Sequence, residues 1–397
     1  MQGHFESVVK KTVGKDLICI QDTSEYNYEH HKGILKDGTL GTISDNRSTG
    51  LRVHPMLVLD RKDEFAYGFS SLEILNRADK TADRHEREYK KLPIEEKESF
   101  RWLQAINNTK SMLSEAQSVT IVADRESDIY QLWSRIPDTK THLVIRTSLM
   151  RIFENEQGTP INPTDRSKSI GHTTMVLQGN PEQKTRVANL EVFVQKAWTK
   201  KPQRVYDHQD ASRVMVYVIV AKEVVKQGDT VDEPIEWILL TDIAVESMEH
   251  ATEIINIYKS RWNIEQIFRL TKKKGFCLED SQLETAHALE NLIAMVFIAA
   301  VKIFQMVKSR NDECRAAIDI FDDAEIALLT KINKGVEGKT DKSKNKFEPG
   351  TLAYAIWIIA RLGKWKPEDK EPAGPITLLA GWQALNHYIL INRIVSE

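Results

Sequence analysis

The stretch VTIVAD at residues 119–124 is a short apolar run that ends in an aspartate, Asp124. A second stretch, LICIQD at residues 17–22, repeats this pattern and ends in Asp22. Both runs predict buried strands that give way to loops at the aspartate. Ligand sites of open α/β sheets gather at such strand ends, because the strand fixes the side chain while the loop leaves it open to solvent. Taken singly, each aspartate is more simply explained as a turn or capping residue.

The rest of the chain predicts strands that alternate with helices. Further strands are predicted at 51–59, 65–69, 142–147 and 237–241, and helices at 94–117, 248–274 and 286–309 and in the tail. Between 149 and 235, turn-rich segments separate short β-prone runs, which is typical of a mostly β insertion. The sequence therefore predicts an α/β fold in which an inserted β module interrupts the core.

Composition limits the class of protein. Hydrophobic residues make up 41% of the 397 residues and the formal net charge is −2, so any DNA-binding charge must be concentrated locally. Cys19, Cys277 and Cys314 lack C-x-x-C spacing, which excludes a cysteine zinc site and indicates a reducing compartment. The N-terminus has no apolar segment of a secretory signal, and the apolar run 292–307 is short for a membrane span and contains Lys302. We therefore expect a cytoplasmic protein with no membrane partner.

The helix predicted at 248–274 carries an unusual set of polar side chains. At about 100° per residue, five of them share a stripe about 80° wide. They are Tyr258, Arg261, Glu265, Arg269 and Lys272. A solvated face with pairs such as Arg261–Glu265 would explain them. The alternative is a phosphate chain running along the helix with Glu265 aimed at a metal, because a solvated face is expected to mix its charges and this one holds a lone acid among cations.

Two aspartates at strand ends and a glutamate from a helix form a ligand set for a pair of divalent cations. All-oxygen ligation favours two Mg²⁺ or Mn²⁺ ions over zinc. In such sites one ion activates a water or a 3′-hydroxyl, and the other stabilises the leaving oxygen. The sequence thus predicts a metal-dependent site for phosphoryl transfer, built from Asp22, Asp124 and Glu265.

Four residues of the helix also carry a family resemblance. The spacing of Tyr258, Arg261, Glu265 and Lys272 is that of the Tyr-Arg-Glu-Lys signature, and the chain resembles the bacterial insertion-sequence DDE transposases that bear it. Further segments resemble that family in the same order along the chain: QDTSEYNY at 21–28, VADRESDIY at 122–130, WILLTDIAVES at 237–247 and ARLGKWKPEDK at 360–370. The resemblance therefore covers nearly the whole chain.

The resemblance implies an RNase H-like catalytic core whose metal-binding triad is Asp22, Asp124 and Glu265. It implies a division into residues 1–148 as the first part of the core, 149–235 as a β-rich insertion, 236–286 as the second part with the glutamate helix, and 287–397 as a helical C-terminal dimerisation region.

The same match implies a set of DNA contacts. Tyr258, Arg261 and Lys272 are expected to bind phosphates of the cleaved transposon end, and Arg269 and Lys273 extend their basic surface. Arg146 corresponds to a basic residue near the DNA of the end. Trp237 corresponds to a tryptophan that stacks on a flipped-out base, where an aromatic platform offsets about 1–3 kcal/mol of unstacking per base. From the sequence alone, Trp237 is more simply explained as a core tryptophan of an apolar strand, and only the resemblance favours the stacking role.

The implied activity is cut-and-paste transposition of double-stranded DNA by a homodimer that joins transposon ends to target DNA. Nicking, hairpin formation, hairpin opening and strand transfer share one site, because all are in-line phosphoryl transfers. Only 21 residues precede Asp22, so we expect the family's N-terminal end-binding domain to be missing. A truncated regulator that dimerises with full-length transposase and inhibits it is therefore the alternative. A housekeeping RNase H-like nuclease is a third hypothesis, which the Tyr-Arg-Glu-Lys helix argues against.

Overall fold

The structure of the chain is a computed structural model. It describes residues 1–36, 40–45, 47–77, 92–148, 151–165, 168–177, 185–202, 210–225, 234–273, 275–369 and 371–396. The contacts divide the chain into two compact units, which are described separately. The sheet unit comprises Gln2–Ser24 and Arg52–Ile264. The helical unit comprises Glu25–Leu51 and Glu265–Glu397, together with Met1.

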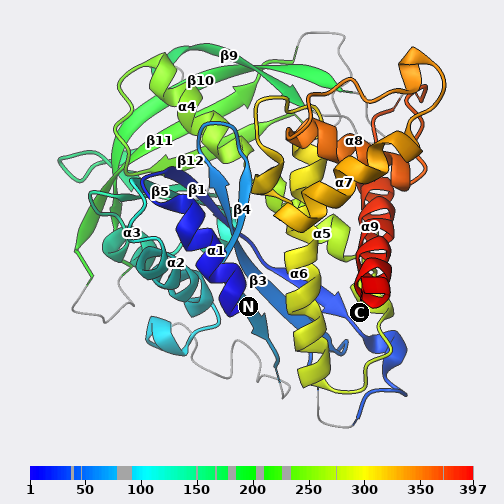
Figure 1. The fold of residues 1–397 in the computed structure, drawn as a ribbon. Coiled ribbons are helices and arrows are strands. Elements are labelled where there is room, and N and C mark those ends of the chain that lie inside the picture. The colour runs from blue at the N-terminus through cyan, green and yellow to red at the C-terminus, as the bar shows by residue number, and fades with distance from the viewer. Residues whose placement is uncertain are drawn as a thin grey trace. The chain divides into compact units, whose positions relative to one another are not determined.

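A mixed sheet forms the frame of the sheet unit (Figure 1). Its first strands are β1 (Asp16–Gln21), β3 (Gly50–Asp60), β4 (Ala66–Leu75), β5 (Ser118–Ala123), β6 (Thr141–Arg146) and β12 (Glu236–Thr241). They lie in the order β4-β3-β1-β5-β6-β12. Strands β1, β5 and β6 are parallel to one another, whereas β3, β4 and β12 pair antiparallel with their neighbours. The predicted mixed α/β fold with a large sheet is confirmed.

Long antiparallel strands extend the sheet beyond β12. They are β9 (Ser169–Leu177), β10 (Arg186–Lys200) and β11 (Arg213–Glu223), and the two-residue strands β7 (Phe153–Glu154) and β8 (Pro160–Ile161) follow at the edge. Strand β11 pairs along its length with β10 on one side and β12 on the other. The described residues between 149 and 235 are thus mostly β, and they continue the central sheet by hydrogen bonds. Residues 149–150, 166–167, 178–184, 203–209 and 226–233 lie outside the described part.

Helices cover the sheet within the same unit. They are α1 (Gln2–Thr12), α2 (Phe100–Met112), α3 (Tyr130–Arg135) and α4 (Met248–Lys259). Helices α1 and α2 both pack on β4, whereas α4 packs against β5, β6 and β10. The helix predicted at 94–117 is therefore present but shorter, because a separate 3₁₀ turn occupies Ile94–Glu96.

The helical unit contains most of β2 (Ser24–Asn27) and a group of helices. They are α6 (Ala286–Ser309), α7 (Asp323–Val336), α8 (Leu352–Leu362) and α9 (Pro375–Ser396). Helices α6, α7 and α8 pack on α9, and α8 is buried along most of its length. Side-chain caps mark three of the helix starts: Thr285 accepts from the amide of Ala288, Asp322 from that of Glu325 and Thr351 from that of Tyr354.

Helix α6 is long and apolar enough to cross a membrane, and among the described helices it alone meets that criterion. Within the helical unit, 56% of its most apolar window is buried. Its Lys302 ammonium lies 2.8 and 3.0 Å from the two carboxylate oxygens of Glu325, which is itself buried. A buried charge needs such a partner inside a folded protein. The interior position and the ion pair are those of a core helix, as the lysine in the run predicted.

The prediction of one continuous helix over 248–274 was wrong. Helix α4 ends at Lys259, and α5 (Trp262–Thr271) begins after a turn at Ser260 and Arg261. The turn is tightened by i→i−3 bonds, in which the amide of Arg261 donates to Tyr258 O and that of Ile264 to Arg261 O. The buried Ser260 hydroxyl also donates to Ile257 O, at 2.6 Å. A uniform advance of about 100° per residue therefore does not connect Tyr258 with Glu265.

Candidate active site

The two aspartates named by the sequence stand side by side in the sheet unit. Strands β1 and β5 are parallel neighbours whose last paired residues are Ile20 and Val122. Continuing that register by two residues places Asp22 opposite Asp124, and adjacent strands lie about 4.8 Å apart. Both side chains are half-buried. The sheet thus brings two carboxylates to one open edge, at the carboxyl ends of two parallel strands.

Both aspartates also act as turn residues. The Asp124 carboxylate accepts from the amide of Glu126 at 2.9 Å and caps the 3₁₀ turn Arg125–Ser127. The Asp22 carboxylate accepts from the amide of Thr23 at 2.7 Å. The simpler explanation of each aspartate therefore holds, and it is compatible with ligand binding because a carboxylate has about four lone-pair sites.

Arg261 binds one of the two carboxylates. Its Nη1 donates to Asp22 Oδ2 at 2.8 Å, and both side chains are largely shielded from solvent. The residue lies in the turn between α4 and α5, so the helix break decides where its guanidinium points. Helical spacing did not indicate this contact between Arg261 and Asp22.

Tyr258 lies at the centre of an aromatic and basic cluster. Its ring meets that of Trp237 edge-to-face, with centroids 5.0 Å apart, and the two residues are only 3% and 8% exposed. Arg146 hydrogen-bonds the Tyr258 side chain and also donates to Glu236 O at 3.2 Å. Burial raises the pKa of Tyr258, while the positive charges of Arg261 and Arg146 act in the opposite direction. Trp237 therefore has the surroundings of a core tryptophan.

Four further predicted residues belong to the helical unit. Glu265 is half-buried on α5 and Arg269 is exposed on it, whereas Lys272 and Lys273 follow its last residue. The Lys272 ammonium lies 5.2 Å from the centre of the Tyr26 ring. Helix α5 crosses the division between the units at Ile264–Glu265. Across the part of the chain that the structure describes, no group of three or more His, Cys, Asp or Glu side chains is placed to hold a metal. The structure thus brings together two members of the predicted triad.

A buried histidine that the sequence analysis did not single out supports the loop of Asp22. His54, on β3, is fully buried and makes ring-nitrogen contacts with Thr23 Oγ1 at 2.8 Å and Gln21 Oε1 at 3.2 Å. These are the two neighbours of Asp22 in the chain. Burial is the main cause that lowers the pKa of His54 to about 3, so the ring is neutral. A lone histidine inside the apolar run LRVHPMLVL was the available signal.

Arg101, in the first turn of α2, links the loops of the two aspartates. Its Nε donates to Thr23 Oγ1 at 3.2 Å and its Nη2 to Glu126 Oε2 at 3.4 Å. Thr23 is the neighbour of Asp22, and the amide of Glu126 is the donor to Asp124. No local pattern marks Arg101, because its partners lie 78 and 25 residues away in the chain.

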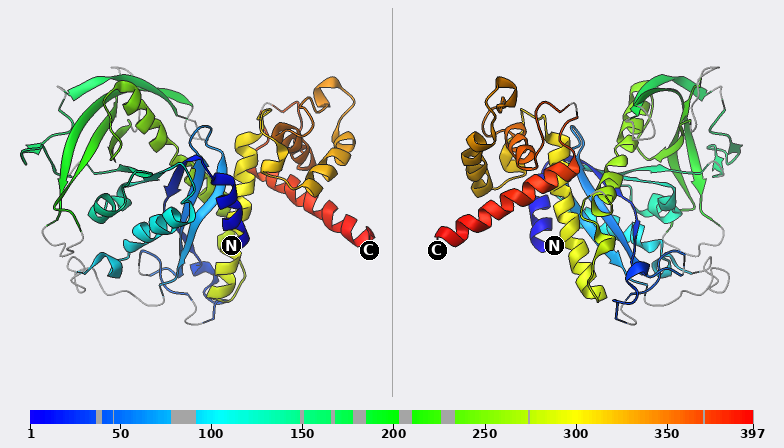
Figure 2. Two further views of the ribbon diagram at one scale, coloured as in Figure 1. Left: turned by 60° about the vertical axis from the view of Figure 1, so that its left-hand side comes forward. Right: turned by 90° about the vertical axis from the view of Figure 1, so that its right-hand side faces the viewer.

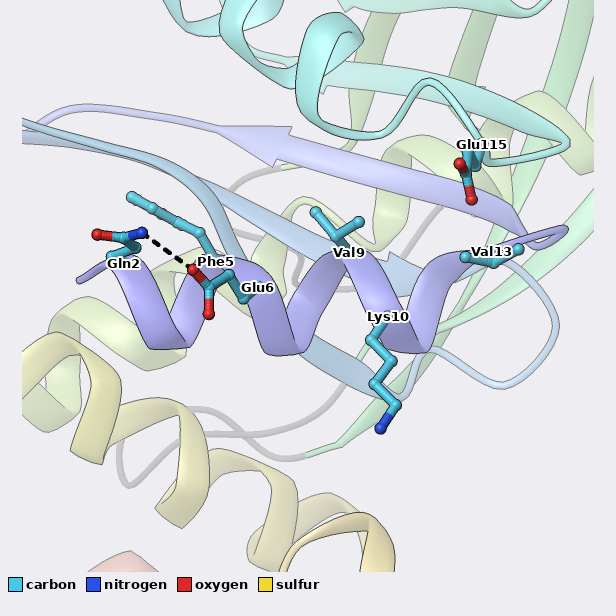
Figure 3. Close-up of a pocket in the computed structure, with 7 residues that line it drawn as sticks. All are labelled: Gln2, Phe5, Glu6, Val9, Lys10, Val13 and Glu115. Atoms are coloured by element: carbon cyan, nitrogen blue, oxygen red, sulfur yellow. Dashed lines mark hydrogen bonds between the residues drawn. The ribbon is translucent and has the colours of Figure 1, made fainter.

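A pocket of the sheet unit lies elsewhere, beside α1. It has a volume of about 580 Å³ and follows the exposed face of α1, where Figure 3 shows Phe5, Val9 and Val13 beside it. Its far wall is Glu115, which precedes β5, whereas Asp124 follows that strand. The six residues of β5 span about 20 Å at 3.3 Å each. The pocket therefore does not belong to the aspartate pair.

The donor set fits a hard divalent cation. Two neighbouring carboxylates supply oxygen ligands, and neither is sealed from solvent. Oxygen ligands suit Mg²⁺ and Mn²⁺ and disfavour zinc, which prefers nitrogen and sulfur. A mixed sheet with paired carboxylates at the ends of parallel strands is thus an arrangement that suits metal-assisted chemistry.

Comparison with known protein families identifies the family of the chain. Residues 82–302 match the family model described as the transposase DDE domain, and the match covers more than half of the 397 residues. The chain belongs to the DDE transposase family. The matched span contains Asp124 and Glu265 and begins after Asp22. Membership supports a transposase that cleaves and transfers DNA and uses divalent metal ions, as the family generally does.

Proposed function

We propose that this protein is a cut-and-paste DNA transposase with an RNase H-like core, of the subgroup that includes the transposase of the composite kanamycin-resistance transposon. The single observation that carries the proposal is the register of β1 and β5, which sets Asp22 opposite Asp124. The strand order β4-β3-β1-β5-β6, with three antiparallel strands and then two parallel ones, supports an RNase H-like sheet. We assign residues 1–148 and 236–286 to this core and 149–235 to its β-rich insertion.

Asp22, Asp124 and Glu265 are the proposed metal ligands. When bound, two Mg²⁺ or Mn²⁺ ions supply an activated nucleophile and stabilise the leaving oxygen. The chain itself fixes the first two carboxylates by strand register and by the amides of Thr23 and Glu126. Glu265 is the proposed third ligand, from the first turns of α5.

Arg261 is the proposed link between the carboxylates and the DNA. Its guanidinium donates to Asp22. Arginine also recognises phosphate oxygens in a forked geometry, so Arg261 is the residue beside Asp22 that suits a phosphate of the DNA. A residue that holds Asp22 and the scissile strand together would position the phosphate over the carboxylates.

The other proposed contacts follow the DNA away from Arg261. Tyr258 and Arg146 lie together in the sheet unit, and Lys272, Arg269 and Lys273 extend the basic surface in the helical unit. Trp237 is proposed to meet a flipped base. Because it is 8% exposed, that contact requires the DNA to reach the edge of its ring beside Tyr258.

The proposed reaction is a series of in-line transfers at one site. Water nicks the transposon end, the freed 3′-hydroxyl attacks the opposite strand to form a hairpin, and the hairpin is reopened. The 3′-hydroxyl then attacks target DNA. In each step one phosphodiester bond breaks and one bond to the same phosphorus forms.

A homodimer through the region 287–397 is proposed as the active assembly. The last turns of α9 run out from the other helices of the helical unit (Figure 2). Tyr388, Leu390, Ile391 and Ile394 on these turns are each about half exposed or more. Contiguous apolar surface of this kind marks interaction sites. A synaptic complex needs two copies because a transposon has two ends.

The decisive experiment compares Asp124→Asn with the wild type on a precleaved transposon-end substrate. We expect Mg²⁺-dependent strand cutting and joining to vanish while the unfolding transition stays unchanged, because asparagine keeps the size of the side chain and removes its charge. Asp128→Asn is an unsuitable control because Asp128 holds Arg151 and Trp133. Asp323→Asn, at an exposed position of α7, is the better one. Undiminished cutting by Asp124→Asn would refute the site.

A further inference from the structure

A pocket in the helical unit combines cations with aromatic walls. It has a volume of about 360 Å³ and lies between α8 and the loop that joins α7 to α8, with the buried residues Ile356 and Ala360 of α8 at its base. This volume lies in the range of about 300–1,000 Å³ that is usual for small-molecule sites. The pocket shares no residue with the proposed catalytic site.

Four cations line the pocket: Arg310, Lys342, Lys344 and Lys346. No acidic side chain occurs among the described residues that line it. Lys344 forms an ion pair with Asp341 at 3.0 Å, but both groups are more than half exposed. Such surface ion pairs contribute only about 0–1 kcal/mol to stability. An anion with greater charge can therefore replace Asp341 as the partner of Lys344. The pocket therefore has the electrostatics of an anion site.

The sequence KSKNK at 342–346 presents its lysines on one side because the loop is anchored on the other. Asn345 points inward, where its Nδ2 donates to Tyr354 O at 3.2 Å and to Asn333 Oδ1 at 3.1 Å. The backbone is extended at Lys344, with φ −91° and ψ 151°. Alternate residues of an extended chain face opposite sides, so Lys344 and Lys346 lie together on the side away from Asn345.

The start of this loop is also fixed. The buried Ser343 hydroxyl donates to Thr340 O at 2.8 Å, and the amide of Thr340 donates to Ser343 Oγ at 3.1 Å. The amide of Gly338 donates to Ser343 O at 3.0 Å. The lysines are thus carried by a loop with its own hydrogen-bond frame, and the cost of ordering that loop is met on folding rather than on binding.

Three aromatic side chains complete the pocket: Phe347, Trp357 and Trp365. Trp357 is 7% exposed, whereas Phe347 and Trp365 are half-buried. The Trp365 indole donates to Glu371 O at 3.0 Å, which fixes its plane. Planar side chains beside cations match the two parts of a nucleotide, because bases stack on aromatic rings and phosphates bind lysine.

We propose that this pocket binds one nucleotide of a DNA strand, with the phosphate on Lys344 and Lys346 and the base against Phe347 and Trp365. The inference rests on the proposed function, because the transposase supplies DNA as the partner. A base is available to such a pocket only in a single strand or in a duplex that is locally opened, which is the state that hairpin formation requires. The pocket is therefore a second contact with the strand, and it shares no residue with the proposed catalytic site.

The test uses the full chain and two fluorescent strands of equal length, one of oligo-dT and one abasic. We expect Lys344→Ala/Lys346→Ala to weaken oligo-dT binding about tenfold and to reduce the salt slope by about 0.7, since the variant loses one single-strand phosphate contact. The control Lys331→Ala/Lys334→Ala removes the same charge from exposed sites on α7 and should bind as the wild type does. Equal losses in the two double variants would overturn the proposal.

The base contact has its own measurement. Oligo-dT should quench tryptophan fluorescence, the abasic strand should not, and Trp365→Phe should reduce the quenching while phenylalanine maintains the fold. Equal quenching by both strands, or quenching unchanged in Trp365→Phe, would overturn the nucleotide assignment. The two proposals can fail independently. Loss of cutting in Asp124→Asn tests the catalytic proposal, and that variant should still bind oligo-dT. Loss of oligo-dT binding in the lysine variant tests the pocket.

Discussion

The strand ends that carry Asp22 and Asp124 and the helix that carries Glu265 are fixed in different ways. The strands are held by backbone pairing on both sides, and their register leaves the two aspartates one relative position. Helix α5 follows a tightened turn at Ser260 and Arg261, so its direction depends on one turn and on side-chain packing. We therefore expect the sheet to supply a rigid half of the proposed site and α5 to supply an adjustable half.

The variant Glu265→Gln tests whether α5 contributes to the proposed site at all. If α5 supplies the third ligand, the loss of its charge removes several kcal/mol of stabilisation from the transition state, and cutting should fall about 10³-fold. Titration with Mn²⁺ should also show weaker binding, which is a readout independent of activity. Glu313→Gln, an exposed residue of the helical unit, is the matched control. If Glu265→Gln cuts and binds Mn²⁺ like that control, the strand ends alone form the site.

A second variant tests how much of the rigid half depends on Trp237. Because this indole is buried against Tyr258, Trp237→Ala should lower the free energy of unfolding by about 3–5 kcal/mol, measured by denaturant unfolding. Trp237→Phe keeps an aromatic ring and should lose much less stability. With the phenylalanine variant, hairpin formation should be impaired more than nicking if the larger indole also meets a base. Equal impairment of both steps would assign Trp237 to packing alone.

The two halves also differ in what the sequence could predict. The runs LICIQD and VTIVAD predicted β1, β5 and the position of both aspartates at strand ends, because apolar β-prone residues followed by a charged one describe a strand end locally. Their adjacency needed the pairing of β1 with β5, which joins residues about a hundred positions apart. The apolar pattern predicted where the two strands end. Only the pairing of β1 with β5 places their aspartates next to each other.

The break between α4 and α5 was hidden from the sequence for a physical reason. No glycine or proline occurs at 248–274, so local propensity favours one helix. Ser260 is buried and bonds back to Ile257 O, and Arg261 is drawn to Asp22, a residue 239 positions earlier. The sequence analysis did not predict the roles of His54 and Arg101 for the same reason, because their partners lie elsewhere in the chain. Long-range polar contacts therefore account for most of what pattern and propensity missed.

The third variant changes Arg261, which lies in the turn between α4 and α5. If Arg261 contacts a phosphate as proposed, Arg261→Ala should weaken DNA binding severalfold and lower the salt slope by about one. It also leaves Asp22 without its guanidinium partner, which should lower the free energy of unfolding by about 1–3 kcal/mol. Lys62→Ala removes one exposed charge from the same unit and serves as control. An unchanged salt slope would leave Arg261 a structural partner of Asp22 and reject it as a phosphate contact.

The smallest expected effect lies at the end of the sheet away from the aspartates. His142, near the start of β6, contacts Asp242 Oδ2 at 2.7 Å, and this hydrogen bond raises the pKa of His142 while the charge of Arg61 opposes it. A raised pKa means that the pair stabilises the fold fully below about pH 6.5, the ordinary pKa of histidine, and loses this contribution as the pH rises through the folded value.

His142→Asn should therefore cost about 1 kcal/mol of unfolding free energy in mild acid and less in mild base, as measured by denaturant unfolding. His172→Asn, an exposed histidine on β9, should show no such pH dependence. Since Asp242 also accepts from the amide of Leu143, it fastens the start of β6 to the chain after β12. If loosening this distant end leaves the metal affinity of Asp22 and Asp124 unchanged, register alone holds the strand ends. If the metal affinity falls together with the free energy of unfolding, the positions of Asp22 and Asp124 depend on the stability of the whole sheet.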